Sequence, residues 1–235
     1  NVTDSTAVDS VYTNITYPNG SVVPTDLANV GPFRYNASFA IPILVGRYNY
    51  TIFANDSSGN LNATEKGFFS GVDLTAPVLI SLAPAAASSW NLGEIIEVAA
   101  NVTDGIGVGY VVANITYPNG TRTEVPLVNA VGSRYNASFA VPLLGGLYYI
   151  SFAANDTSGN SNVSSQTNFS GTDTMSPNVS ALSSVPIIGN LSQSFNLSAN
   201  VTDNGALSVI RFNVSNRSGV VTATLQASLS GPGRD

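Results

Sequence analysis

Aspartates stand in turn-like stretches that recur along the chain, and they are its side chains best suited to hold a metal ion. Asp73 lies in GVDLTAP, Asp104 in NVTDG and Asp156 in ANDTSGN. Asp173 and Asp203 occupy equivalent positions in the next repeat of the pattern. Carboxylates are hard oxygen ligands of the kind that Ca²⁺ prefers, so the pattern predicts calcium at these aspartates.

Further oxygens for such a site would come from the Asn155 amide and nearby backbone carbonyls, because Ca²⁺ takes about six to eight oxygen ligands. The alternative is ordinary turn chemistry, in which an Asp or Asn beside a glycine accepts hydrogen bonds from the backbone that follows it. The residue types alone leave both interpretations open.

Catalytic side chains are scarce. The chain has no histidine and no cysteine, which excludes Ser–His and Cys–His nucleophiles and the usual zinc ligand sets. Glu94 and Glu97 are close in sequence, but we interpret them as solvated residues on the outward face of a strand rather than as a pair for glycoside hydrolysis. Residues 105–109 read GIGVG; because this stretch opens a strand and not a helix, it predicts a turn rather than a dinucleotide loop. We expect no enzymatic activity.

Asn-x-Ser/Thr sequons, the acceptor motif for N-linked glycans, are spread along the whole chain. Charged residues make up only 9% of the chain, against about 25% in a typical soluble domain, so we expect attached carbohydrate to keep the surface wet. The alternative is that a chain rich in Asn, Ser and Thr forms sequons by chance. The acceptors are Asn1, Asn14, Asn19, Asn36, Asn49, Asn55, Asn62, Asn101, Asn114, Asn119, Asn136, Asn155, Asn162, Asn168, Asn178, Asn190, Asn196, Asn200, Asn213 and Asn216.

Composition narrows the classes of partner. The net charge of −6 and the single lysine, Lys66, argue against nucleic acid. The longest apolar stretch, residues 139–154, is broken by Pro142, Gly145 and Gly146 and is too short to span a bilayer. Without cysteine, each domain has to rely on its own core rather than on disulfides. We expect an extracellular or cell-surface protein, and a chain that starts without Met or a signal peptide is expected to be a mature or internal segment.

The elements that must position these residues are repeated. NITYPNGS at Asn14 returns as NITYPNGT at Asn114, and RYNASFA at Arg34 returns at Arg134, with no gap between the copies. A third copy begins with NVTDNG at Asn200, and GPGRD near the end of the chain matches GPFRY of the first copy. The repeat predicts three domains: residues 1–74 without the first strands, a complete copy over 75–174, and residues 175–235 without the last strands.

Alternation of apolar and polar residues predicts about seven short strands in the complete copy. We expect them over residues 77–83, 94–102, 111–117, 121–128, 135–141, 148–154 and 162–169, with a Pro/Ala/Ser loop reaching Gly93 after the first. Ile96, Val98, Ala100 and Val102 share one face of the second strand. Short strands at this spacing favour an all-β fold of tandem immunoglobulin-like sandwiches, in which Tyr148 or Tyr149 would form the tyrosine corner.

The sequons support this strand phase, because a glycan cannot enter a packed core. Asn101, Asn114 and Asn136 all fall opposite the apolar face of their strands, and Asn49 does the same beside Tyr48 and Tyr50. A slip of one residue would bury every one of these acceptors.

Three stretches carry a family resemblance: TAPVLIS at the start of a repeat, NVTDGIGVGYVV in its middle and GGLYYISFAANDTSGN near its end. The chain resembles, over essentially its whole length, the tandem Ig-like and fibronectin-III-like repeats of bacterial and archaeal surface proteins. Its many sequons and its single lysine are more similar to archaeal than to bacterial examples. Sandwiches of this kind serve as spacers, adhesins, lattice proteins and filament subunits.

The sandwich topology also predicts where the aspartates meet. The loop after the second strand, the loop after the sixth strand and the entering linker lie at the same pole of an Ig-like sandwich. Asp104, Asp156 and Asp73 occupy these three segments, so we expect their carboxylates to converge at a domain junction. Asp173 and Asp203 would begin the same arrangement in the next copy.

These observations favour a structural extracellular protein: a glycosylated array that associates with copies of itself in a surface filament, S-layer-like lattice or stalk. The alternatives are an adhesin or carbohydrate-binding module, and spacer domains of a larger secreted enzyme. The incomplete outer copies predict a stretch of a longer polypeptide; the alternative is that neighbouring chains complete these copies by donating strands.

Overall fold

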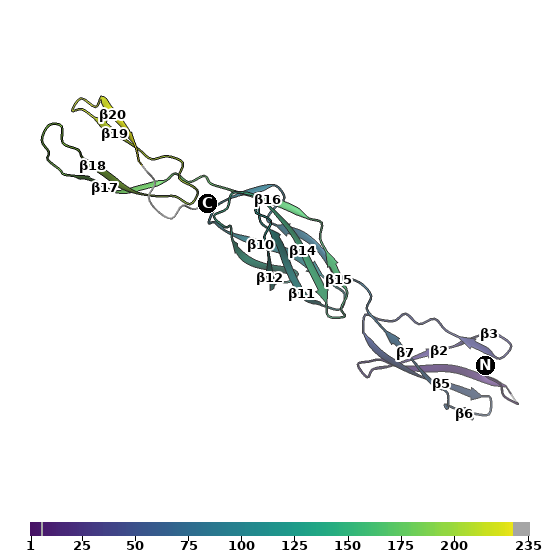
Figure 1. Ribbon diagram of the computed structural model, residues 1–235. Coiled ribbons are helices and arrows are strands. Elements are labelled where there is room, and N and C mark those ends of the chain that lie inside the picture. The colour runs from purple at the N-terminus through teal and green to yellow at the C-terminus, as the bar shows by residue number, and fades with distance from the viewer. Residues whose placement is uncertain (6, 228–235) are drawn as a thin grey trace. The chain divides into compact units, whose positions relative to one another are not determined.

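The computed structural model describes residues 1–5 and 7–227, and every regular element in this part of the chain is a β-strand (Figure 1). None of the described residues form a helix long and apolar enough to cross a membrane. The chain forms two compact units, one of which combines Asn1–Val78, Val102–Tyr110 and Ala154–Asn162. The match of GPGRD to the first copy lies outside the described residues.

The first copy contains a five-stranded antiparallel sheet in the order β2-β1-β5-β6, in which β7 also pairs with β5. A separate two-stranded sheet joins β3 and β4. The strands are β1 (Val8–Thr16), β2 (Val22–Asp26), β3 (Ala28–Gly31), β4 (Arg34–Asn36), β5 (Gly46–Asp56), β6 (Leu61–Asn62) and β7 (Lys66–Gly71).

The middle copy is the most complete, with its strands joined in the order β8-β10-β13-β12-β11-β14-β16-β9 and β15 paired to β14. β11 and β14 lie one hundred residues after β1 and β5, with the same lengths, which confirms the repeat. The strands are β8 (Val78–Ala83), β9 (Ser88–Asn91), β10 (Ile95–Thr103), β11 (Val108–Thr116), β12 (Arg122–Val131), β13 (Arg134–Ala140), β14 (Gly146–Asp156), β15 (Ser161–Val163) and β16 (Thr167–Thr172).

The third copy is described as two hairpin-like pairs, β17 with β18 and β19 with β20. These strands follow the order of the first strands of the middle copy. Their bounds are β17 (Asn178–Val185), β18 (Asn196–Thr202), β19 (Arg211–Ser215) and β20 (Val221–Gln226).

Strand β12 divides the middle copy into two layers, because it changes its partner along its length. Its first part, as far as Leu127, pairs with β11, whereas Val128 and the residues after it pair with β13. β8, β10 and β13 therefore form one layer, and β11, β14, β16 and β9 form the other. This is the two-layer arrangement of an immunoglobulin-like sandwich, as predicted.

The core lies between these layers and has the predicted phase. Ile96, Val98, Ala100 and Val102 are each at most 3% exposed, and Val111, Ala113 and Ile115 at most 1%. Ala99, on the opposite face of β10, is also fully buried. The alternation therefore identified the core residues, although both faces of β10 are partly covered.

Two details of the predicted strands were wrong. The segment expected as a loop before Gly93 contains β9, which pairs in parallel with β16 through Ser88↔Phe169 and the three pairs that follow. The last strand, expected over residues 162–169, is instead split into β15 and β16. β9 has only four residues, too few to show an alternation of apolar and polar positions, and its partner β16 is distant in the sequence. The sequence pattern therefore missed β9.

The repeated Pro-Asn-Gly stretch forms a hairpin turn, as predicted. Tyr117 N–H donates to the Thr121 carbonyl over 2.8 Å, and Gly120 N–H donates back to the Tyr117 carbonyl over 2.9 Å. Gly120 has φ of 84°, a conformation that glycine adopts without the steric penalty of a side chain. The turn at Gly20 has the same hydrogen bonds and φ of 86°.

A buried tyrosine links strand β14 to the loop before it. Tyr148 is fully buried, its ring stacks on Phe169 at 4.9 Å between centroids, and its hydroxyl donates to the Leu144 carbonyl over 2.7 Å. This is the tyrosine corner, and it uses Tyr148 rather than Tyr149, whose side chain points outward and is 41% exposed. The first copy repeats it with Tyr48 and Leu44 at 2.8 Å.

We expect Tyr148→Phe to lower the free energy of unfolding by about 1–2 kcal/mol, because the Leu144 carbonyl would lose its only side-chain donor inside the fold. Tyr149→Phe is the matched control and should change the free energy by less than about 0.5 kcal/mol. Urea denaturation of both variants measures the difference; equal effects would contradict the assignment of the corner to Tyr148.

Candidate functional site

Three carboxylates meet in one compact unit of the structure, as the loop topology predicted. Asp73 follows β7, Asp104 lies between β10 and β11, and Asp156 is the last residue of β14. One oxygen from each carboxylate lies within 4.8 Å of the other two. This acidic cluster is the only group of three or more His, Cys, Asp or Glu residues among the described residues with the spacing of a metal site.

Each aspartate uses one oxygen in ordinary turn chemistry. Asp104 Oδ1 accepts from the backbone N–H groups of Ile106 at 2.8 Å and Gly107 at 2.9 Å. Asp73 Oδ1 accepts from Thr75 N–H at 3.0 Å. These bonds explain why the loops have their local shape, and they orient the second oxygen of each carboxylate.

Turn chemistry does not account for the second oxygens of Asp73 and Asp104. Asp73 Oδ2 and Asp104 Oδ2 are buried from solvent and have no hydrogen-bond partner. A buried carboxylate oxygen without a donor is costly, and two of them beside a third carboxylate repel one another. A cation of the hard, oxygen-binding kind would satisfy all three groups.

The amide that contacts the acidic cluster is Asn160, and the role of Asn155 as a calcium ligand stays a prediction. Asn155 is exposed, whereas Asn160 Nδ2 donates to Asp156 Oδ2 at 2.7 Å and to the Asp73 carbonyl at 3.1 Å. Asn160 thereby ties the β14 loop to the segment after β7. The repeated ANDTSGN stretch could have identified this bond from the sequence, because Asn60 makes the same side-chain bond to Asp56 at 2.7 Å in the first copy.

The Asp156 carboxyl is held in its charged form. The side chain is only 5% exposed, and this burial opposes ionisation, but hydrogen bonds from Asn160, Ser158 and Gly159 outweigh it and keep the pKa of Asp156 below its ordinary value of 3.8. The charge therefore persists at every pH at which the protein would normally work.

The two aspartates of the next copy are placed differently. Asp173 Oδ1 accepts from Met175 N–H at 3.1 Å, and a side chain at Gly205 would collide with the Asp173 carboxylate. Asp203 Oδ1 is buried without a partner. The predicted approach of these two loops is thus present, but the described residues bring no third carboxylate to them.

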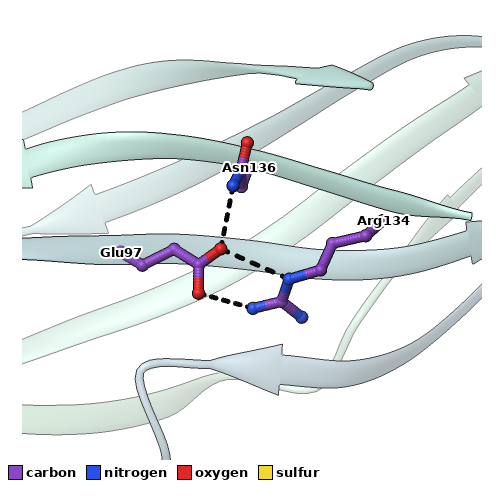
Figure 2. A network of polar contacts seen from close by, with 3 residues as sticks. All are labelled: Glu97, Arg134 and Asn136. Atoms are coloured by element: carbon purple, nitrogen blue, oxygen red, sulfur yellow. Dashed lines mark hydrogen bonds and ion pairs between the residues drawn. The ribbon is translucent and has the colours of Figure 1, made fainter. Parts of the chain in front are cut away.

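The other carboxylates weighed for chemistry have separate partners. Glu97 accepts from Arg134, with Nη2 to Oε2 at 2.6 Å, and from Asn136 Nδ2 at 2.9 Å (Figure 2). The Arg134 and Asn136 bonds hold the pKa of Glu97 below its ordinary value, whereas a general acid needs a raised one. Glu94 instead accepts from Asn91 N–H at 3.0 Å. The GIGVG stretch joins two strands, as expected for a turn.

None of the sequon acceptors is a buried residue, although Asn101 Oδ1 is itself shielded from solvent. Asn19 and Asn119 stand exposed in the hairpin turns, where each Oδ1 accepts from the hydroxyl of its own sequon, Ser21 at 2.8 Å and Thr121 at 2.7 Å. Six acceptors are half-buried: Asn14, Asn55, Asn101, Asn114, Asn136 and Asn168.

Comparison with known proteins found no family model and no curated protein that matches the chain. Among solved structures, it is similar to the tetra-tandem repeat in the extending region of a large adhesion protein, with 20% identity over 98% of this chain and a TM-score of 0.44. The chain spans 58% of the length of that structure.

The chain is also similar to the fibronectin(III)-like modules of CbhA from Clostridium thermocellum, with 17% identity over 74% of this chain and 82% of that one and a TM-score of 0.31. A third similarity is to the FN1–FN3 domains of chicken CNTN1, with 13% identity over 97% and 77% of the two chains and a TM-score of 0.34. Tandem repeats and fibronectin-III-like modules are the class that the sequence resemblance named.

We expect Asp156→Asn to destabilise the fold, because the new amide nitrogen would replace Oδ2 and face the Asn160 Nδ2 donor. Since the folded pKa of Asp156 is lowered, its contribution is complete above 3.8 and disappears as pH falls through the lowered pKa. The gap between wild type and variant should therefore be full at pH 7 and shrink as the pH falls below 3.8 and through the lowered pKa. Denaturation in the presence of chelator measures it; Asp9→Asn, on the exposed side of β1, is the control, and a gap independent of pH would contradict the assignment.

Proposed function

We propose that the chain is part of a structural extracellular protein, in which N-glycosylated sandwich repeats build a surface filament, lattice or stalk. The repeat itself is the functional unit, and copies of the same protein are its partners. The observation that carries this proposal is the exposed acceptor at the same hairpin turn of successive copies, Asn19 and Asn119. A sugar at this position extends from the turn without touching the core.

Three further features support the proposal. Few charged residues are present to keep the surface wet, so carbohydrate has a physical role there. The copies differ by no insertion over the aligned strands β1 and β11 or β5 and β14, as expected where a rigid unit is repeated. The Arg134 and Asn136 bonds hold the pKa of Glu97 below its ordinary value, whereas a general acid needs a raised one.

Mass spectrometry and electron microscopy of material secreted by an N-glycosylating host test this proposal. We expect a mass well above the 24.3 kDa of the polypeptide, glycopeptides at Asn19 and Asn119, and ordered polymers in the microscope. A fully unmodified chain would contradict glycosylation. Dispersed monomers that bind a glycan array would instead favour an adhesin or carbohydrate-binding module.

We further propose that the acidic cluster of Asp73, Asp104 and Asp156 binds calcium. The two buried and unpartnered oxygens, Asp73 Oδ2 and Asp104 Oδ2, support it. A bound cation would hold the segment after β7 against the loops after β10 and β14. Asp173 and Asp203 would form part of a second site of the same kind. In an extracellular setting, millimolar calcium makes even a site with Kd of about 10⁻⁴–10⁻³ M well occupied.

Calcium at about 10 mM should raise the stability of the chain by roughly 1.4–2.7 kcal/mol relative to chelator, because the ion binds the folded state alone. Asp104→Asn keeps the Oδ1 acceptor of the turn and removes one repelling charge. We therefore expect this variant to melt higher than wild type in chelator and to lose the calcium-dependent gain. Thermal melts measure both; Glu124→Gln, an exposed residue of β12, is the charge-matched control. An unchanged midpoint on adding calcium to wild type would discard the site.

A further inference from the structure

An exposed aromatic ring faces a glycan acceptor across strands β5 and β7. Asn49 pairs directly with Phe68 in the antiparallel register, and both residues are exposed, Phe68 to 60%. Asn49 begins the sequon Asn-Tyr-Thr. Directly opposed residues of an antiparallel pair share one face of the sheet, with Cβ atoms about 5 Å apart.

The middle copy has the same pair with its two members exchanged. Tyr149 on β14 pairs directly with Asn168 on β16, and Asn168 begins the sequon Asn-Phe-Ser. Tyr149 replaces Asn49 and Asn168 replaces Phe68 at an offset of one hundred residues. The aromatic and the acceptor have thus changed strands, and their opposition across the sheet has been kept.

The two copies keep the ring stack on the buried face of this strand pair, although they also differ at Arg47/Leu147, Tyr50/Ile150, Thr51/Ser151, Lys66/Gln166 and Gly67/Thr167. On the buried face, Tyr48 opposes Phe69 in the first copy, and Tyr148 opposes Phe169 in the middle copy. The two ring pairs stack at 5.0 Å and 4.9 Å between centroids. A single exposed aromatic is ordinary, but independent drift at two positions has no reason to conserve an aromatic opposite an acceptor.

We propose that the sugar attached to Asn49 packs on the ring of Phe68, and that the sugar attached to Asn168 packs on the ring of Tyr149. A pyranose presents one face of C–H groups with slight positive charge, and an aromatic ring presents a negative face at the matching distance. The inference rests on the glycosylation proposed above, and adds the surface on which two of the glycans lie.

Arg47 orients the Phe68 ring in the first copy. Its guanidinium carbon lies 3.8 Å from the centroid of the Phe68 ring, a cation–π contact that holds the exposed side chain in one orientation. One face of Phe68 is thereby covered, and the remaining face is left for the sugar, whose hydroxyls are acceptors for the neighbouring guanidinium.

Three other strand acceptors have no aromatic residue opposite them in these strand pairs. Asn14 is opposed by Thr51, Asn114 by Glu124 and Asn213 by Thr224. Asn114 with Glu124 therefore provides a matched control: an acceptor on a sandwich strand whose opposite residue has no ring.

A double-mutant cycle on the full chain, secreted by an N-glycosylating host, tests the first pair. Phe68→Ala should lower the melting temperature by about 2–4 °C more when Asn49 carries a glycan than in the background of Asn49→Gln. The loss of the Arg47 contact is common to both backgrounds and cancels. The corresponding cycle of Glu124→Ala and Asn114→Gln should be additive.

The double exchange Tyr149→Asn with Asn168→Phe tests the middle pair without removing the contact. It places an acceptor before Ile150 and Ser151, which completes a new sequon on β14, while the ring moves to β16. We expect the glycopeptide signal to move from β16 to β14 and the melting temperature to stay within about 1 °C of wild type. Tyr149→Ala alone should lower it by about 2–4 °C in the glycosylated chain only.

The outcomes separate this inference from the proposed function. Glycans present at Asn49 and Asn168 with additive cycles would overturn the packing and leave glycosylation intact. Occupied turn acceptors with bare Asn49 and Asn168 would also overturn the packing alone. A chain without any glycan would overturn both proposals.

Discussion

A stacked pair of rings joins two strands in the first copy and again in the middle copy. Tyr148 lies flat on Phe169, joins β14 to β16, and anchors the preceding loop through the Leu144 carbonyl. The same pair recurs as Tyr48 on Phe69. Without disulfides, the repeat depends on such contacts, in which aromatic burial contributes more stability than any surface pair. The stack therefore helps to position the other residues of β14 and β16.

The acidic cluster is one consequence. Tyr148 and Asp156 both belong to β14, so one strand carries a ring of the stack and a carboxylate of the cluster. Asn160 then binds both the Asp156 carboxylate and the Asp73 carbonyl. The hydrogen bond from Gly107 N–H holds Asp104 in place. Three like charges are therefore gathered by contacts that lie outside the cluster, and the electrostatic cost of gathering them is what makes a cation the natural complement.

The outward faces of the same strands carry a different chemistry. Charge is sparse there, and the Glu97–Arg134 pair, 47% and 32% exposed at its side chains, adds at most about 1 kcal/mol because water screens it. Acceptor asparagines alternate with core residues by the two-residue period of a strand. Asn49 stands directly next to Tyr48 in sequence and Asn168 directly next to Phe169, so the ring stack also determines the face on which these two sequon asparagines lie.

Local sequence patterns were sufficient to predict much of this fold. Alternation identified the core positions of β10 and β11, the one-hundred-residue offset identified the repeat, and Pro-Asn-Gly identified the hairpin turn, because each depends only on neighbouring residues. The convergence of Asp73, Asp104 and Asp156 followed from sandwich topology. Only the tertiary structure decided the partners: β9 beside β16, Asn160 between Asp156 and the Asp73 carbonyl, the unpartnered Oδ2 atoms, and the exchanged ring and acceptor across two strands. These depend on which distant segments pair and in which register, and long-range pairing leaves no local signal in the chain.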